Sequence, residues 1–231
     1  MPPNHPINIE ALLSHVPLFN GLAPGEITRI AHATREIQII KGETLFHRGD
    51  PCTGFHLLVY GQVKLSFTSA QGNEKIVEIV SQGQSFGEAL MFLDKPYVVS
   101  AQALTDTLLL HISKTVIFEE LEHDHKLARK MLASMGMRLH QLMNDVESYS
   151  LQSGKQRIIG YLLRELPESD QNGTNVVLTL LSNKGDIASR LNLTQEHFSR
   201  ILNELSGLGL IMVEGKKIHI SSVAKLRNHE S

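Results

Sequence analysis

Cysteine and tryptophan are nearly missing from the sequence, which has one cysteine and no tryptophan among 231 residues. A single thiol, Cys52, cannot form an internal disulfide, and it leaves no cysteine cluster of the kind that holds zinc or an iron–sulfur centre. The sequence therefore excludes an iron–sulfur sensor and indicates an intracellular protein. Cys52 is interpreted as an inert loop cysteine, with a thiol sensor as the alternative.

Long apolar runs and two common enzyme motifs are absent as well. No stretch reaches the roughly 18 apolar residues of a membrane helix, and residues 1–6 lack the charged and apolar regions of a secretory signal. We therefore expect a cytoplasmic protein without a membrane partner. The sequence contains neither a phosphate-binding loop nor a G-x-G-x-x-G run, and we do not expect an enzyme.

The net charge is small and unevenly distributed. Residues 1–154 carry 12 basic and 16 acidic side chains, whereas residues 155–231 carry 10 basic and 8 acidic ones. The first part is therefore acidic and the second mildly basic. This asymmetry permits DNA binding in the C-terminal third, although the whole chain has a net charge of −2.

Residues 36–113 contain short apolar runs rich in Val, Ile and Phe, which predict the strands of a β-sandwich or barrel. A short helical segment, residues 9–30, precedes them. Glycines fall between the runs, where turns need a positive φ: Gly42, Gly49, Gly61, Gly72, Gly83 and Gly87. We predict a first domain at residues 1–113.

Residues 114–150 have no proline and one glycine, as expected for a long helix. Apolar positions recur there with a mean period of 3.5 residues: Ala128, Leu132, Met135, Leu139, Leu142, Val146 and Tyr149. Packing of the helix along its own domain would give the same spacing. We favour a two-helix seam across a homodimer, and we interpret this segment as a dimerisation helix and hinge.

Residues 184–205 fit two helices joined by a tight turn. Small Ala188 stands where the helices would cross, and Asn192 occupies a turn position that needs a left-handed backbone. Thr194 is expected to cap the second helix. The pattern predicts a helix-turn-helix, whose second helix enters the major groove of DNA.

The start of the second helix carries polar residues that can read bases: Gln195, Glu196, Ser199 and Arg200. Arginine bonds to guanine, glutamate accepts from cytosine, and serine or glutamine can serve either role. A solvated face with an ion pair between Glu196 and Arg200 is the alternative.

A β-hairpin is predicted downstream, with Lys216 and Lys217 at its tip, where they could contact phosphate. Together with the helix-turn-helix, the hairpin predicts a winged DNA-binding domain at residues 151–231.

Three sequence motifs resemble the cyclic-AMP receptor and fumarate/nitrate reductase regulator (CRP/FNR) family: Phe46–Asp50, Gly61–Lys64 and Ser85–Ala89. The resemblance covers essentially the whole chain. It implies an α+β fold with a cyclic-nucleotide-binding-like β-roll, a long dimerisation helix and a C-terminal winged helix-turn-helix. It also implies a homodimer that binds a palindromic operator and acts on RNA polymerase.

The segment Glu196–Arg200 matches the Glu-x-x-Ser-Arg pattern of the fumarate/nitrate branch, which reads a TTGAT half-site. By resemblance, Glu196, Ser199 and Arg200 would contact bases, and Gln195 stands where the branch varies.

The effector pocket is expected at Gly87, Glu88, Val98 and Val99. Family members that bind cyclic AMP place an arginine against the cyclic phosphate, and this chain has apolar Val98 in that position. A buried phosphate without its arginine is poorly compensated, which argues against a cyclic nucleotide.

Residues 74–103 are similar to the nitric-oxide-responsive branch, the dissimilatory nitrate respiration regulators. This similarity implies haem b as cofactor, nitric oxide as effector, and control of nitrogen-oxide or anaerobic respiration genes. No motif fixes the iron ligand, and several histidines are candidates: His15, His47, His56 and His111.

Three alternatives to nitric oxide stay open. The opening Met1–Pro3 is similar to carbon-monoxide-sensing haem activators, but Ala89 and Leu90 stand where their partner histidine belongs. The others are a cyclic nucleotide and a β-roll that binds a different ligand or none.

Overall fold

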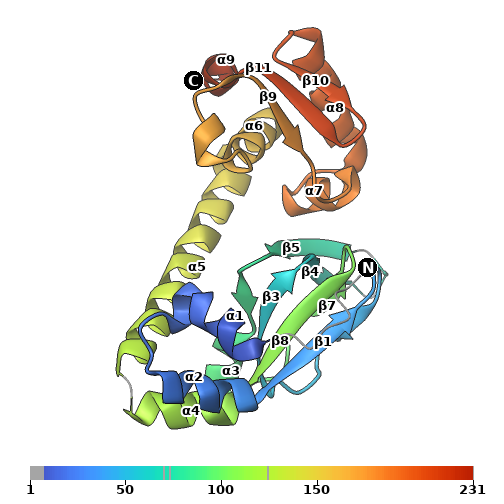
Figure 1. The fold of residues 1–231 in the computed structure, drawn as a ribbon. Coiled ribbons are helices and arrows are strands. Elements are labelled where there is room, and N and C mark those ends of the chain that lie inside the picture. Colours follow the sequence, from blue (N-terminus) through green and yellow to red (C-terminus); the bar gives the residue numbers. More distant parts are fainter. Residues whose placement is uncertain (1–7, 70, 73, 124, 231) are drawn as a thin grey trace. The chain divides into compact units, whose positions relative to one another are not determined.

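The computed structural model describes residues 8–69, 71–72, 74–123 and 125–230, and it divides into two compact units, Met1–His140 and Gln141–Ser231 (Figure 1). The predicted limits after residues 113 and 150 do not coincide with this division, which falls inside a single long helix. None of the helices in the described part of the chain is long and apolar enough to cross a bilayer.

The first unit is a β-roll of two antiparallel four-stranded sheets, ordered β1-β8-β3-β6 and β2-β7-β4-β5. Its strands are β1 (Thr34–Ile39), β2 (Thr44–Phe46), β3 (Gly54–Tyr60), β4 (Gln62–Thr68), β5 (Glu74–Ser81), β6 (Ser85–Phe86), β7 (Ser100–Ala103) and β8 (Thr107–Ser113). The β-strand prediction is confirmed, but β2 and β6 were not foreseen because two or three residues are too few to show a period.

The turns between the strands have the backbone that their glycines predict. All six turn glycines named above have a positive φ. At Gly61, φ is +91°, and an added Cβ would lie 2.4 Å from Thr107 Oγ1. This turn therefore requires glycine for both its backbone conformation and its lack of a side chain.

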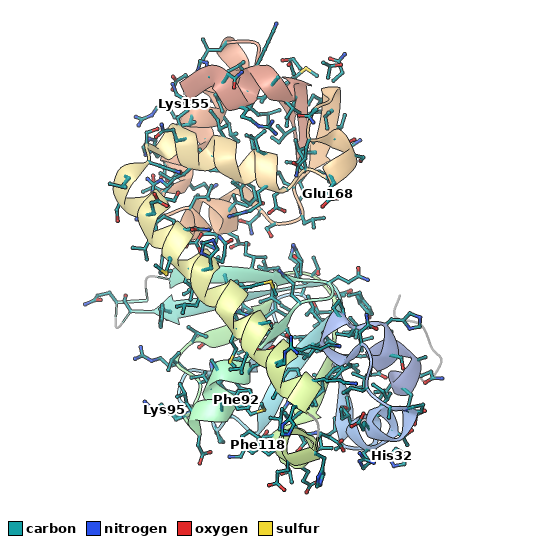
Figure 2. All side chains as sticks on the ribbon, turned by 90° about the vertical axis from the view of Figure 1, so that its left-hand side faces the viewer. His32, Phe92, Lys95, Phe118, Lys155 and Glu168 are labelled. Carbon is teal, nitrogen blue, oxygen red and sulfur yellow. The ribbon has the colours of Figure 1, made fainter. Side chains whose placement is uncertain are left out.

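Helices cover one side of the roll: α1 (Ile9–His15), η1 (Pro17–Phe19), α2 (Pro24–His32), α3 (Glu88–Leu93), α4 (Lys114–His123) and the start of α5 (His125–Leu151). Their apolar faces form one core with β3 and β8, in which Phe55, Leu110 and Met131 are buried. Figure 2 shows Phe92 of α3 beside Phe118 of α4, with ring centroids 5.6 Å apart. A second core, around Phe46, lies between the two sheets.

The second unit surrounds a third core that includes Ile158, Ile187 and Phe198. It contains the end of α5, α6 (Gly154–Arg164), η2 (Glu168–Asp170), β9 (Thr174–Thr179), α7 (Lys184–Arg190), α8 (Gln195–Gly207), β10 (Ile211–Glu214), β11 (Lys217–Ser222), α9 (Val223–Arg227) and η3 (Asn228–Glu230). The strands form one antiparallel sheet, ordered β10-β11-β9. The two units together give the predicted α+β fold.

Candidate DNA-binding surface and effector cavity

The helix-turn-helix is formed by α7 and α8, with local geometry that the sequence predicts. Ala188 is buried at the crossing of the helices. Asn192 has φ of 57°, the left-handed backbone expected at the turn. The Thr194 side chain accepts a hydrogen bond from the backbone N–H of His197 at 3.2 Å, which caps α8. These contacts fix how α8 leaves the turn.

One face of α8 packs inward and the other meets solvent. Phe198, Ile201 and Leu202 are buried in the core of the unit. The predicted reading residues lie on the outer face, where Gln195, Glu196 and Arg200 are exposed and Ser199 is half-buried. The described residues include no ion pair between Glu196 and Arg200, so neither side chain is neutralised by the other.

The predicted hairpin is present as β10 and β11, with Gly215 at its tip at φ of 60°. Lys216 and Lys217 are both exposed there. Lys216 Nζ donates a hydrogen bond to the carbonyl oxygen of Leu181 at 3.3 Å, which ties the tip to the segment before α7. The hairpin thus presents two cations on the unit that contains the helix-turn-helix.

The first unit contains a largely apolar cavity of about 140 Å³. Its lining comes from both sheets, α3 and α5: Phe46, Leu65, Phe86, Gly87, Glu88, Ala89, Leu90, Tyr97, Val99, Ser134, Met135 and Arg138. Three of the four residues expected in an effector pocket, Gly87, Glu88 and Val99, are therefore in place. Val98 is not: its side chain is 47% exposed and does not line the cavity.

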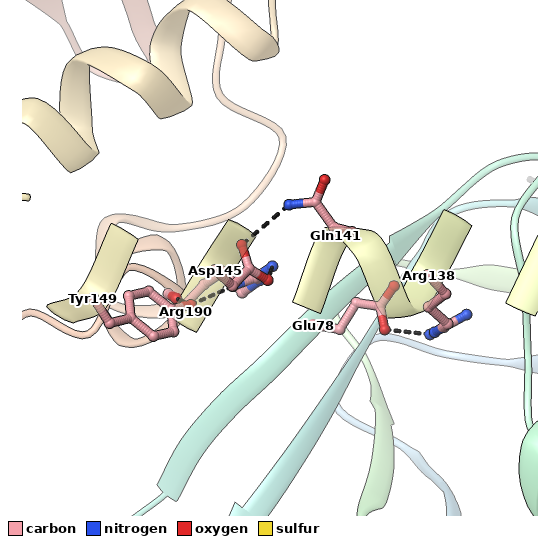
Figure 3. A network of polar contacts seen from close by, with 6 residues as sticks. All are labelled: Glu78, Arg138, Gln141, Asp145, Tyr149 and Arg190. Atoms are coloured by element: carbon pink, nitrogen blue, oxygen red, sulfur yellow. Dashed lines mark hydrogen bonds and ion pairs between the residues drawn. The ribbon is translucent and has the colours of Figure 1, made fainter. Parts of the chain in front are cut away.

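The polar end of the cavity is formed by Glu88 and Arg138. Burial raises the pKa of Glu88 above its ordinary value, and a hydrogen bond from Ser85 partly offsets this effect. Arg138 donates to the carbonyl oxygen of Ser85 at 2.8 Å and is paired with Glu78 (Figure 3). Because protein groups already neutralise this guanidinium, the cavity offers no spare cation for a cyclic phosphate.

Ser85 begins the Ser85–Ala89 motif of the sequence analysis, but it also belongs to an enzyme-like motif that the sequence analysis missed. Residues 83–87 have the G-x-S-x-G spacing of a hydrolase nucleophile elbow. The Ser85 side chain is bonded to Glu88, however, and no histidine is among the described residues that line the cavity. Among the described residues, the group bonded to Ser85 is thus a buried carboxyl of raised pKa and not a histidine.

Beside the cavity, two buried histidines pack into a cluster of rings. The His56 ring stacks on Phe86 with centroids 5.1 Å apart and lies 4.8 Å from that of His111. Nδ1 of each histidine has no hydrogen-bond partner among the described residues. Burial, reinforced by His111 and Arg35, lowers the pKa of His56 from 6.5 to about 3. His56 is therefore neutral at physiological pH.

The cavity in this form does not fit a haem. Pockets that hold drug-sized ligands usually measure about 300–1,000 Å³, and the cavity here measures about 140 Å³. His56 and His111 do not line the cavity, and His15 and His47 are exposed. Met1–Pro3, the other candidate, lies outside the described residues. The described residues also contain no group of three or more His, Cys, Asp or Glu side chains that could hold a metal ion.

Two residues of the predicted dimer seam are engaged within their own units. Met135 lines the cavity, and the Tyr149 hydroxyl donates to the backbone oxygen of Arg190 at 2.6 Å. Ala128 is half-buried. The period of 3.5 residues over residues 128–149 predicted α5 correctly, although the segment predicted as one long helix, residues 114–150, is divided between α4 and α5. The period does not show which of several neighbouring rows of side chains faces a partner.

The exposed row of α5 is rotated slightly from the predicted one. This exposed row, which we call the α5 stripe, consists of four side chains that are between 62% and 65% exposed: Leu132, Leu139, Met143 and Val146. Met143 was not predicted. Leu142, at 44%, lies at the edge of the stripe.

Two family profiles match the chain. Residues 36–124 match the cyclic nucleotide-binding domain, and residues 156–229 match the Crp-like helix-turn-helix domain. The solved structure of DNR from Pseudomonas aeruginosa is 30% identical, spans 96% of this chain and 98% of its own, and has a TM-score of 0.51. The chain belongs to the CRP/FNR family. It is thus a DNA-binding transcription regulator of CRP/FNR type.

More distant CRP/FNR relatives support the fold. FixK2 from Bradyrhizobium japonicum has a TM-score of 0.75 at 21% identity and spans 86% of this chain and 98% of its own. The CRP-like cAMP-activated global transcriptional regulator of Mycobacterium tuberculosis is 21% identical over 219 residues, which are 94% of this chain and 98% of that protein.

The buried His56 predicts acid sensitivity of this CRP/FNR regulator. Below pH 6.5 the unfolded chain binds a proton at His56, whereas the folded chain binds it only near pH 3. Stability is therefore lost as the pH falls, by about 3 kcal/mol for this group between about pH 7 and pH 4. In denaturant unfolding measured at several pH values, His56→Leu should lose less free energy of unfolding between pH 7 and pH 4 than the wild-type protein. Exposed His47→Leu is the control, and an equal loss in all three proteins would refute the assignment.

Arg200→Ala tests the reading face. We expect it to weaken binding to the specific operator by about 1–3 kcal/mol and to relax discrimination at one base pair of each half-site. Lys217→Ala, at the hairpin tip, should instead weaken binding to all DNA sequences by a similar factor and reduce the salt dependence of the affinity. Binding titrations against single-base variants at two salt concentrations separate the two effects. An unchanged specificity ratio in Arg200→Ala would contradict the role of this residue.

Proposed function

We propose that this CRP/FNR regulator acts as a homodimer that reads a palindromic operator with TTGAT-type half-sites under the control of a small effector. The observation that carries the proposal is the polar quartet at the start of α8, in which three side chains are exposed and Ser199 is half-buried: Gln195, Glu196, Ser199 and Arg200. The N-terminal residues of a recognition helix are the ones that reach base edges in the major groove.

The side chains of the quartet can recognise a half-site that presents both guanine and cytosine edges. The guanidinium of Arg200 can bond bidentately to guanine O6 and N7, and the carboxylate of Glu196 can accept from cytosine N4. The two side chains are not paired with each other, so no ion pair has to break before they meet DNA. The cations at the hairpin tip add phosphate contacts, which carry affinity but no sequence information.

The α5 stripe supports the homodimer. Four large apolar side chains in one row along a helix are costly to leave in water, and self-pairing of two such helices buries them in a coiled-coil seam. A two-fold dimer matches a palindrome, because its two recognition helices are related by the same axis as the half-sites. The half-sites would lie about one helical turn apart.

The cavity supports control by a small effector. Its residues Ser134, Met135 and Arg138 belong to α5, the same helix that carries the α5 stripe. A ligand that binds differently to two arrangements of this helix would shift the population between them. Action on RNA polymerase, and control of nitrogen-oxide or anaerobic respiration genes, complete the proposal by resemblance.

Haem as cofactor and nitric oxide as effector remain predictions from the resemblance alone. A haem in the β-roll would have to enlarge the cavity of about 140 Å³, because the described lining leaves too little room. Within the lining, the Met135 thioether and the Tyr97 hydroxyl are the groups of the types that ligate haem iron.

Leu139→Glu tests the dimer. A charge in the middle of the α5 stripe would be buried without a partner, so we expect monomers in sedimentation and loss of binding to the palindrome. Met137→Glu is the matched control: Met137 is equally apolar and 70% exposed, but it lies roughly 160° around the helix. A Leu139→Glu variant that stays dimeric would contradict the assigned seam.

Titration of the purified protein with hemin tests the haem prediction. The resemblance predicts a Soret band that saturates at one haem per chain and shifts with nitric oxide. Ala89→Trp places a bulky side chain at the cavity lining and should weaken the saturating band if the haem enters there. Uptake that is loose and non-saturating in the wild-type protein would exclude haem as the cofactor.

A further inference from the structure

A buried ion pair in the second unit joins α5 to the helix-turn-helix. The Arg190 Nη2 atom lies 2.6 Å from Asp145 Oδ2, and each side chain is only 12% exposed (Figure 3). Asp145 lies on α5 and Arg190 is the last residue of α7, so the contact links residues 45 apart in the sequence. It joins the long helix α5 to the first helix of the helix-turn-helix.

Neighbouring side chains complete the hydrogen bonding of this pair. Gln141 Nε2 donates to the other carboxylate oxygen of Asp145 at 3.1 Å. Arg190 also donates to the Tyr149 hydroxyl, and that hydroxyl donates in turn to the backbone oxygen of Arg190. The last carbonyl groups of a helix lack hydrogen-bond donors within the helix, and the Tyr149 hydroxyl is such a donor for the last residue of α7. We call Gln141, Asp145, Tyr149 and Arg190 the α7 latch.

The α7 latch lies directly at the turn of the helix-turn-helix. The turn begins after Arg190 and reaches its left-handed residue at Asn192. Arg157 of α6 lies 6.0 Å from the ring centroid of Tyr149 and donates to the carbonyl oxygen of Asn192 at 3.5 Å. Both ends of the short turn are thus held by side chains from α5 and α6. The direction in which α8 leaves the turn depends on these contacts.

The energetic effect of a buried ion pair depends on whether both partners are present. Removal of one partner would leave the other charge buried and uncompensated, whereas replacement of both by apolar residues is often neutral or stabilising. A buried ion pair is therefore weak evidence of a role in stability alone. Its hydrogen bonds have a fixed geometry, which makes it suited to setting the angle between two helices.

We infer that Asp145 is a positioning residue for DNA binding, which acts through Arg190 to set the orientation of α8. Asp145 itself contacts no base or phosphate in this role. The end of α5, from Gln141 onward, is then a structural part of the DNA-reading unit. Changes that loosen the α7 latch misdirect the recognition helix while leaving its reading residues intact.

The test uses the full-length protein and an operator selected from random DNA by the wild-type protein. Asp145→Asn and Arg190→Gln should each lower operator affinity by about tenfold or more, with little change in binding to unrelated DNA. Glu147→Gln, an exposed carboxylate on the same helix, is the control and should bind like wild type. Operator affinity that is unchanged in both single variants would overturn the inference.

A double variant separates orientation from stability. Asp145→Leu combined with Arg190→Met removes both charges, so thermal unfolding should return to the wild-type temperature or rise above it. The ratio of operator to unrelated-DNA affinity should nevertheless stay about tenfold or more below wild type. Recovery of that ratio together with stability would show that the pair only stabilises the fold, and would overturn the inference.

Discussion

Met131 of α5 is buried in the core of the β-roll, Arg138 of the same helix closes the polar end of the cavity, and Asp145 bonds to the end of α7. One helix therefore contributes to the candidate effector cavity and to the support of the helix-turn-helix. The burial of this face leaves the α5 stripe on another face, free to meet a second chain. The proposed sensing, dimerisation and DNA reading all depend on which face of α5 packs within the chain and which face is exposed.

The charged side chains of the cavity and of α8 differ in whether they are paired. In the cavity, Arg138 is neutralised by Glu78, so a ligand meets apolar walls and one buried carboxyl group of raised pKa. On α8, by contrast, Arg200 and Glu196 are exposed and not paired with each other. In the proposed function, the paired charge of the cavity suits a ligand with little charge, and the exposed charges of α8 suit contact with bases and phosphates.

Local patterns in the sequence predicted local structure well. The turn glycines, the left-handed Asn192 and the capping Thr194 each depend on a backbone requirement that one residue type satisfies. Such local patterns could not predict contacts between residues that lie far apart in the sequence. The pair of Asp145 and Arg190 spans 45 positions, and neither residue stands out in the sequence. For the same reason, periodicity predicted the long helix but not that Met135 and Tyr149 turn toward their own units.

Hydroxyl-radical footprinting on a TTGAT palindrome tests the central claim, that two α8 helices related by a two-fold axis read the two half-sites together. The account predicts two protected patches one helical turn apart, and loss of both when about 5 base pairs, half a turn, are inserted between the half-sites. Protection of each half-site that persists after the insertion would contradict it.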